Sequence, residues 1–364
     1  MSLADYLPVY SGCRYCLMCR HACPVGRATR REATTPHGWG LLIASVERGQ
    51  LSWDAEAVDT LYQCAQCGLC LANCVTDRPL PSAIAAARAE VFTAGLAPSA
   101  VGDVDSRLRQ WGNPFGELPP SAPTNSAPAA LFVGAAAHHL HPDTLSAARR
   151  LLDALGIDHS PIAAGLSSAY LPYALGLLES ARALARSSLH EIAASHCLRL
   201  IVLTPEDAHT FKHIHPELGL PLPNGVEVVE LITLLAEALD DGRLEFRASD
   251  LSFTYHDPAY TPLFPARAAH ARRVLSALTV QPVREMLWRE GRAAPGGTAG
   301  GLRFTHPVLA ARLTRDRLAE AAQSGAEWLV TEDAAAVADF EAHADGTGIK
   351  VKGLYQLAVE NLRD

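Results

Sequence analysis

The sequence of 364 residues predicts an α+β, multidomain fold in which a helical N-terminal module is followed by two duplicated α/β domains. Three observations predict it. Eight of the nine cysteines lie within the first 74 residues, a proline- and serine-rich stretch follows at 118–128, and later segments repeat at a constant offset. These features place the N-terminal module at 1–95, a linker at 96–128, a first α/β repeat at 129–245 and a second at 246–364.

The composition argues against a nucleic-acid binder and a membrane-spanning chain. With 39 acidic and 31 basic residues, the formal net charge is −8, so the basic excess that phosphate contacts require is missing. The longest apolar stretch, 127–137, is far shorter than the roughly 20 residues that cross a bilayer. Residues 1–9 lack the apolar segment of a secretory signal. We therefore expect a cytoplasmic protein with no transmembrane segment.

The cysteines form two runs of the same spacing, C-x-x-C-x-x-C-x-x-x-C. The runs are Cys13, Cys16, Cys19 and Cys23, then Cys64, Cys67, Cys70 and Cys74. Cysteines at such short steps are badly placed to pair as local disulfides. The spacing is instead typical of cubane iron-sulfur ligation, and Pro24 follows the first run as that pattern expects. Paired zinc sites would leave Cys19 and Cys70 without a ligand role, and inert buried thiols are the other alternative.

The spacing also predicts which cysteines share a cluster. A loop with a cysteine at every third residue can supply three of the four thiolates that a [4Fe-4S] cube needs. The fourth cysteine of each run lies too far along the chain and reaches the other cube. We therefore expect two [4Fe-4S] clusters, with Cys13, Cys16, Cys19 and Cys74 holding cluster 1, and Cys64, Cys67, Cys70 and Cys23 holding cluster 2. Between the runs, 38–49 and 53–63 have the apolar spacing of helices.

The remaining chain contains an internal repeat. Residues 148–152 match 271–275 at an offset of 271 − 148 = 123, and 225–228 match 348–351 at the same offset. In each half, an apolar strand (131–133; 251–255) precedes a helix and a second strand that ends in a polar turn (199–203; 328–330). This alternation predicts a parallel α/β sandwich in each half. A glycine-rich segment at 296–301 lacks the residues of a P-loop, so we expect a tight backbone turn there.

With these patterns together, the chain resembles a family of iron-sulfur proteins. The family is typified by the iron-sulfur subunits of glycolate oxidase and of anaerobic glycerol-3-phosphate dehydrogenase, and by the catalytic subunit of heterodisulfide reductase. The resemblance is carried by Cys13 to Pro24, by Thr35-Pro36-His37-Gly38 and by Cys64 to Cys74. It implies that residues 1–95 form a dicluster ferredoxin-like domain and that each later half descends from a repeat with C-C-G and C-P-x-C elements.

The cysteines of those C-terminal elements are replaced here. The replaced elements read Ala163-Ala164-Gly165, Thr204-Pro205-Glu206-Asp207, His256-Asp257-Pro258-Ala259, Pro295-Gly296-Gly297-Thr298-Ala299-Gly300 and Thr331-Glu332-Asp333-Ala334. In relatives such as heterodisulfide reductase, the cysteines hold further clusters. Without soft thiolate ligands no iron-sulfur cluster can be held at these positions. We therefore assign no catalytic residue and consider the chain a non-catalytic subunit.

The resemblance and the lost cysteines together predict a function. We expect an electron-transfer iron-sulfur subunit of an oxidoreductase complex that relays electrons through two [4Fe-4S] clusters. The donor would be a flavin-containing dehydrogenase or an electron-transfer flavoprotein. The acceptor would be a quinone-linked protein, another flavoprotein or a ferredoxin, and it can be membrane-associated. Two alternatives stay open: a stand-alone disulfide- or quinone-type reductase, and a structural or assembly iron-sulfur protein.

Overall fold

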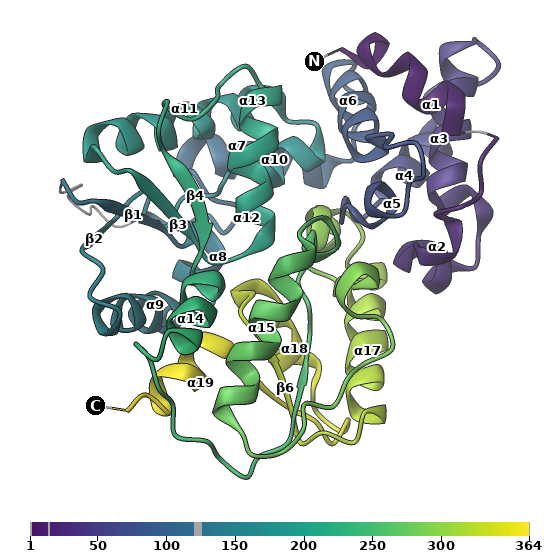
Figure 1. Ribbon diagram of the computed structural model, residues 1–364. Helices are drawn as coiled ribbons and strands as arrows, with labels where there is room; N and C mark the ends of the chain where they lie inside the picture. The colour runs from purple at the N-terminus through teal and green to yellow at the C-terminus, as the bar shows by residue number, and fades with distance from the viewer. Residues whose placement is uncertain (1, 14, 120–125, 364) are drawn as a thin grey trace.

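Helices and two small parallel sheets build the computed structural model, which describes residues 2–13, 15–119 and 126–363 (Figure 1). The N-terminal module lies beside both α/β halves, which follow it along the chain. Among the helices of the described residues, none has the length and apolar character that crossing a membrane requires. The observed mixture of helix and sheet agrees with the predicted fold class at this coarse level.

The N-terminal module is helical. Its α-helices are α1 (Leu7–Cys13), α2 (Pro24–Thr29), α3 (Pro36–Glu47), α4 (Ala55–Tyr62), α5 (Leu69–Ala72) and α6 (Leu80–Thr93). Helix α3 begins after Thr35, whose hydroxyl accepts the Gly38 N–H at 3.2 Å, and helix α4 begins after Asp54, whose carboxylate accepts the Ala57 N–H at 2.9 Å. Such side chains satisfy the free N–H groups of a first turn, which explains where the two helices start. The helices predicted at 38–49 and 53–63 are confirmed as α3 and α4.

A further helix, α7 (Ser99–Trp111), lies within the stretch 96–128 that the sequence assigned to a linker. Its Val101, Val104 and Leu108 are buried in the same core as the N-terminal helices. Apolar residues at this helical spacing give the segment one face to bury, although the surrounding composition is polar. Residues 120–125 of the predicted linker lie outside the described residues.

The first α/β half contains a four-stranded parallel sheet of order β2-β1-β3-β4. Its strands are β1 (Ala129–Phe132), β2 (His159–Pro161), β3 (Arg199–Val202) and β4 (Glu227–Glu230). Its α-helices are α8 (Gly134–His139), α9 (Asp143–Ala154), α10 (Tyr170–Leu175), α11 (Leu178–Ser195), α12 (Pro205–His209), α13 (His215–Glu217) and α14 (Leu231–Asp240). Strands β1 and β3 are buried along nearly their whole length, as expected of a parallel sheet covered by helices.

The second α/β half contains a three-stranded parallel sheet of order β5-β6-β7. Its strands are β5 (Phe253–Tyr255), β6 (Trp328–Thr331) and β7 (Lys350–Gly353), and its α-helices are α15 (Pro265–Leu278), α16 (Leu302–Thr305), α17 (Pro307–Gln323), α18 (Ala334–His343) and α19 (Leu354–Glu360). The four strands predicted from the sequence coincide with β1, β3, β5 and β6, and all four pair in parallel.

The two halves correspond in part. Strands β4 and β7 begin at an offset of 350 − 227 = 123, and the helices that follow them begin at 354 − 231 = 123. The order β1-β3-β4 of the first sheet matches the order β5-β6-β7 of the second. The origin of the two halves by duplication stays a prediction.

A buried ion network joins the halves. Arg267 of α15, with 2% of its side chain exposed, donates to the carboxylate of Glu230 at 2.5 Å and pairs with Glu332. Glu230 ends β4 and Glu332 follows β6, so one guanidinium holds the carboxyl ends of both sheets together. Removing one partner of such a buried pair leaves an uncompensated charge. The ion pair therefore favours the relative placement of the two sheets that keeps Arg267 beside both carboxylates.

The second half also contacts the N-terminal module through the glycine-rich segment. Gly300 and Gly301 have φ values of +64° and +78°, which agrees with the predicted tight turn. A Cβ atom on Gly300 would overlap the backbone oxygen of Ala65, between two cysteines of the second run. The glycine turn therefore lies directly against the backbone of the second cysteine loop, and no side chain fits between the two segments.

We predict that Gly300→Ala lowers the free energy of unfolding by about 2 kcal/mol more than Gly346→Ala does. Both glycines have positive φ, so the two substitutions share the cost of backbone strain. Only Gly300 would also clash with Ala65, because a Cβ atom on Gly346 meets nothing within 4 Å. Urea unfolding followed by circular dichroism measures the difference. Equal losses in the two variants would contradict the close contact between Gly300 and the cysteine module.

Candidate metal centres

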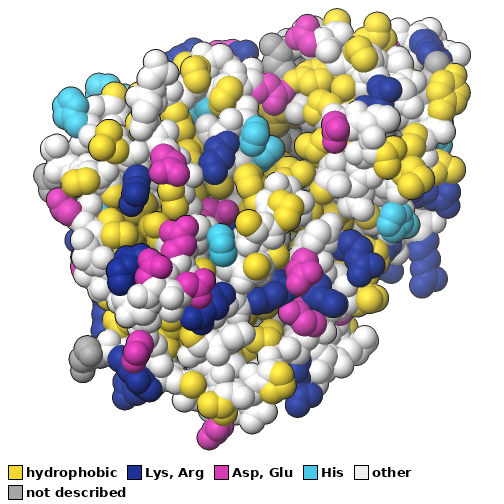
Figure 2. All heavy atoms as spheres, in the orientation of Figure 1, with side chains coloured by type: hydrophobic (Ala, Val, Ile, Leu, Met, Phe, Trp, Pro, Cys, Tyr) yellow, Lys and Arg dark blue, Asp and Glu magenta, His cyan; other side chains and the backbone are white. Residues whose placement is uncertain are grey.

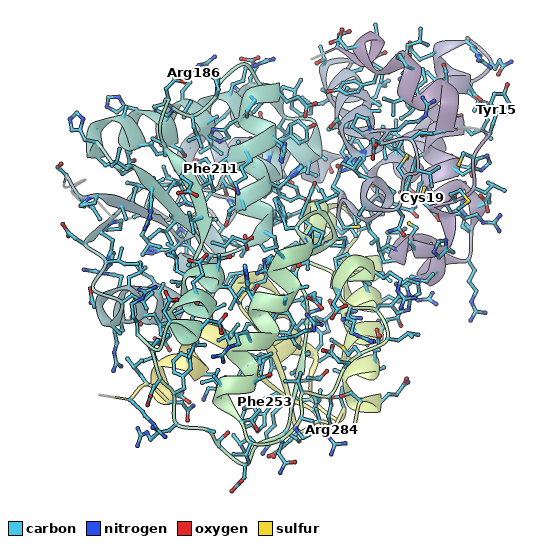
Figure 3. The ribbon with its side chains drawn as sticks, in the orientation of Figure 1. Tyr15, Cys19, Arg186, Phe211, Phe253 and Arg284 are labelled. Carbon is cyan, nitrogen blue, oxygen red and sulfur yellow. The ribbon has the colours of Figure 1, made fainter. Side chains whose placement is uncertain are left out.

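Four thiols line a cavity in the N-terminal module. They are those of Cys13, Cys16, Cys19 and Cys74. Cys13 ends α1, Cys16 is exposed, and Cys74 follows α5. Figure 3 places Cys19 among the sulfur atoms of this module and Tyr15 at its outer edge. The cavity thus combines three cysteines of the first run with the last cysteine of the second.

A second set of four thiols lines a neighbouring cavity. This set is Cys23, Cys64, Cys67 and Cys70. The sulfur of Cys23 accepts the Gly26 N–H at 3.4 Å at the start of α2, and the sulfur of Cys64 accepts the Gln66 N–H at 3.4 Å. The structure therefore groups the eight cysteines into the same two sets that the spacing suggested. That these thiols bind iron stays a prediction at this point.

Burial makes most of these thiols hard to ionise. It raises the pKa of Cys13 to about 12, that of Cys19 to about 11 and that of Cys67 to about 12. Burial likewise raises the pKa of Cys23, Cys64 and Cys70. The neighbouring thiols oppose ionisation further, because several thiolates in one cavity would repel one another. Only a cationic centre can compensate four thiolates at this depth.

Cys74 differs from the other thiols. Its partial burial raises the pKa, but the Thr76 hydroxyl and the N–H groups of Arg78 and Thr76 outweigh this effect, so the pKa of Cys74 is lowered. The Arg78 N–H lies 3.3 Å from the sulfur. Hydrogen bonds to a thiolate stabilise the charged form, which is the form of Cys74 that a metal ligand requires.

The thiol sets fit cubane clusters. Each set offers four soft sulfur donors around a cavity, and backbone N–H groups point at sulfur in both sets. Within the described residues, no three His, Cys, Asp or Glu side chains lie close enough together to hold a single metal ion. A cube binds one thiolate at each of four iron corners, and each cavity is lined by four thiols.

The loop of the second set is held by residues far away in the sequence. The fully buried Arg88 of α6 donates to the backbone oxygens of Cys64 at 2.8 Å and Leu61 at 2.9 Å. The Tyr170 hydroxyl donates to the Gln66 oxygen at 2.8 Å, and the Tyr260 N–H donates to the Cys67 oxygen at 3.3 Å. Both α/β halves therefore position this loop. None of these three residues was predicted from the sequence. The lone arginine in the alanine-rich segment 83–89 is the one signal that could have indicated Arg88.

The replaced elements of the α/β halves also meet in space. Thr204, Glu206, Asp207, Ala259, Glu332 and Asp333 line one cavity between the two sheets. Thr298 of the glycine-rich element lines it too, whereas Ala163 is not part of its wall. The elements that the sequence analysis identified as counterparts of cluster-binding repeats thus surround a common space.

Comparison with known proteins supports an iron-sulfur domain. Residues 10–78 match the family profile of the 4Fe-4S dicluster domain. The chain is an iron-sulfur protein. This match covers the N-terminal module and leaves the subunit family of the whole chain as a resemblance. No curated protein matches the chain.

A solved structure shares the fold. It is described as the crystal structure of a hypothetical protein from Helicobacter pylori, and the TM-score is 0.61 at 13% sequence identity. The similarity covers 90% of this chain and 68% of that chain. It therefore extends over the N-terminal iron-sulfur domain and both α/β halves, and at this identity it concerns the fold alone.

We predict that Gly40→Ala destabilises the protein by about 1 kcal/mol, although alanine normally favours a helix over glycine by roughly that amount. Gly40 lies in α3, and a Cβ atom there would come within 2.8 Å of the Cys13 Cβ. The matched control is Gly102→Ala in α7, where a Cβ meets nothing within 4 Å and the substitution should stabilise. Urea unfolding of both variants checks this, and stabilisation by Gly40→Ala would contradict the close approach of α3 to the first thiol set.

Proposed function

We propose that this chain is the electron-transfer subunit of an oxidoreductase complex and holds two [4Fe-4S] clusters. Cluster 1 would be bound by Cys13, Cys16, Cys19 and Cys74, and cluster 2 by Cys23, Cys64, Cys67 and Cys70. The observation that carries the proposal is the pair of neighbouring cavities, each lined by one of these sets. The dicluster domain at residues 10–78 supports it independently. When bound, such clusters supply one-electron redox chemistry.

The two thiol sets are close enough for a relay. Only three residues separate Cys70, which lies in the four-residue helix α5, from Cys74 of the other set. The short 3-10 helix Arg20–Ala22 likewise separates Cys19 from Cys23. A thiol of one set also affects a thiol of the other set, because charge on Cys19 contributes to raising the pKa of Cys70. Adjacent clusters that exchange one ligand favour electron conduction between them over two independent structural sites.

The exposed side of cluster 1 is the side on which we expect the donor to dock. Tyr15, Leu17 and Met18 flank Cys16 and are 77%, 51% and 57% exposed, and Val75 beside Cys74 is 69% exposed. Figure 2 shows hydrophobic side chains exposed on the N-terminal module, at the upper right of that view. An apolar patch of this kind on a water-exposed loop is typical of a protein-protein contact. Cluster 2 would lie deeper, since Cys23 and Cys64 are buried.

The donor we propose is a flavin-containing dehydrogenase or an electron-transfer flavoprotein. The acceptor is a quinone-linked protein, a flavoprotein or a ferredoxin. We place the complex in the cytoplasm, where free thiols stay reduced before cluster assembly. The domain division 1–95, 96–128, 129–245 and 246–364, with duplicated α/β halves, is part of the same proposal.

Iron analysis tests the clusters and their crossed ligation. The anaerobic full chain should contain about eight irons and about eight sulfides, four of each for every cubane. The double variant Cys13→Ala/Cys74→Ala removes two ligands of one cluster and should keep about four irons. The variant Cys13→Ala/Cys23→Ala removes one ligand from each cluster and should therefore keep fewer than four irons. A higher iron content in Cys13→Ala/Cys23→Ala than in Cys13→Ala/Cys74→Ala would overturn the crossed assignment. About twelve irons in the unmodified chain would show a further cluster in the α/β halves.

Electron transfer tests the relay itself. Cys67→Ala should abolish electron transfer from the partner dehydrogenase, whereas the partner's flavin should still be reduced by its substrate. Cys197→Ala is the control, because Cys197 is a cysteine buried in the core of the first sheet and belongs to neither thiol set. Stopped-flow absorbance of flavin and clusters measures both steps. If flavin reduction also stops in Cys67→Ala, the chain does more than carry electrons. Clusters that dithionite cannot reduce would favour a purely structural role.

A further inference from the structure

The side chain of Arg88 in α6 is a fully buried cation, with an exposed fraction of 0%. Within the described residues no carboxylate pairs with it, and the groups whose charge acts on it are Cys64, Tyr62 and Tyr170. Burial raises the pKa of all three groups, so as a free thiol and free phenols they are neutral. Arginine, in contrast, keeps its charge at any depth. A buried charge is costly unless an opposite charge lies nearby, and these three groups do not supply one while they are protonated.

The hydrogen bonds of Arg88 do not account for its charge. Its Nη2 donates to the backbone oxygens of Leu61 and Cys64 at 2.9 and 2.8 Å, and its Nη1 donates to that of Ala174 at 2.6 Å. All of these acceptors are neutral, and a neutral amide side chain could serve two of them without the cost of a buried charge. The contacts explain why a donor stands at this position. The positive charge needs a separate explanation.

A loaded second thiol set would supply the missing counter-charge. Arg88 reaches this set through the Cys64 oxygen, and Cys64 lines the second cavity. Burial lowers the pKa of Arg88, and charge on Cys64 is the largest effect that opposes this. Four thiolates around a cubane carry net negative charge. The ring of the buried Tyr62, whose centre lies 4.9 Å from the guanidinium carbon, keeps water away on one side. The attraction between Arg88 and a bound cluster is therefore only weakly screened.

Two other arginines near the thiol sets are hydrated or balanced. Arg78 has its backbone N–H 3.3 Å from the Cys74 sulfur, but its guanidinium hydrogen-bonds at the surface, and Cys16 of the same set is exposed. Water screens charges there. Arg27 lies near the second set; burial lowers its pKa, and charge on Glu320 is the first effect that opposes this. A carboxylate thus balances Arg27, whereas Arg88 has the second thiol set as its counter-charge.

Burial and Arg88 act on a cluster in opposite directions. Reduction adds one negative charge to a cubane, so burial makes reduction less favourable and a nearby cation makes it more favourable. Cys23 and Cys64 of the second set are buried, whereas Cys16 of the first set is exposed. With burial alone, an electron would stay on the exposed cluster 1, where we expect the donor to dock. Transfer inward requires a charge that offsets the burial of cluster 2.

We infer that the charge of Arg88 raises the reduction potential of cluster 2 above that of cluster 1, so that electrons pass inward. The inference rests on the proposed electron-transfer function and gives the relay its direction. One electron leaves cluster 1, which is oxidised, and enters cluster 2, which is reduced; no bond forms or breaks and no proton moves. Because the guanidinium binds backbone oxygens, it acts on cluster 2 through its charge and not as a ligand.

The potentials are measured by redox titration of the anaerobic full chain, with the EPR signal of each reduced cluster as the readout. In the unmodified chain, the cluster reduced first should be cluster 2. The variant Cys13→Ala/Cys74→Ala, which should keep cluster 2 alone, identifies its signal. Arg88→Met removes the charge and should make reduction of cluster 2 about tenfold less favourable, the lower end of what a neighbouring unit charge does to an ionisation. A tenfold change corresponds to about 59 mV for one electron.

Two variants separate the charge of Arg88 from its support of the loop. Arg88→Lys keeps the charge and loses part of the hydrogen bonding, so the midpoint of cluster 2 should stay close to that of the unmodified chain. Tyr170→Phe keeps all charges and removes the hydroxyl that donates to the Gln66 oxygen of the same loop at 2.8 Å. The midpoint should stay unchanged there too. An effect of loop structure would appear in Tyr170→Phe, and an effect of lost hydrogen bonds in Arg88→Lys.

Three results would overturn the inference. They are an unchanged midpoint of cluster 2 in Arg88→Met, an equal fall in Tyr170→Phe or Arg88→Lys, and reduction of cluster 1 before cluster 2 in the unmodified chain. The last result needs no variant of Arg88, so the test stays decisive if Arg88→Met does not fold.

Iron analysis of the same samples separates this inference from the proposed function. About eight irons with a midpoint that does not depend on Arg88 would leave the relay standing and remove the role of Arg88. A midpoint that depends on Arg88, in a chain that takes no electrons from the partner dehydrogenase, would keep the role of Arg88 and remove the relay.

Discussion

The arrangement of the whole molecule depends on the backbone carbonyls of the second cysteine loop. Arg88 binds the oxygen of Cys64 from within the N-terminal module, Tyr170 binds the oxygen of Gln66 from the first α/β half, and Tyr260 binds the oxygen of Cys67 from the second. Buried carbonyl groups without partners are costly. One short loop therefore requires all three parts of the chain to be in place, and this is why the N-terminal module lies against both halves.

This constraint gives both α/β halves a structural role, because each of them holds the backbone of the second cysteine loop. Where the resemblance implies cluster ligands, the chain has Glu206, Asp207, Glu332 and Asp333, which are held by hydrogen bonds and by the guanidinium of Arg267, except for Glu206. Ion pairs and caps thus take over the role of joining the carboxyl ends of the two sheets. A cavity of about 130 Å³ remains between them.

The sequence predicted the features that have a local signature. The cysteine spacing suggested the two thiol sets, because a loop of fixed step can reach only certain positions, and apolar runs before polar turns located β1, β3, β5 and β6. Features that depend on contacts between distant segments were missed. Arg88, Tyr170 and Tyr260 stand in ordinary local contexts, and α7 was hidden in a polar stretch because only its buried face is apolar.

Tyr170 and Tyr260, which were not predicted from the sequence, change how the replaced elements of the α/β halves are interpreted. From the sequence alone, their loss argued that nothing could react in the α/β halves. The three-dimensional contacts show that the loop of Cys64 and Cys67 and the cavity wall share Tyr170 and the Ala259-Tyr260 peptide. The space that the replaced elements surround is therefore physically connected to the loop of the second thiol set.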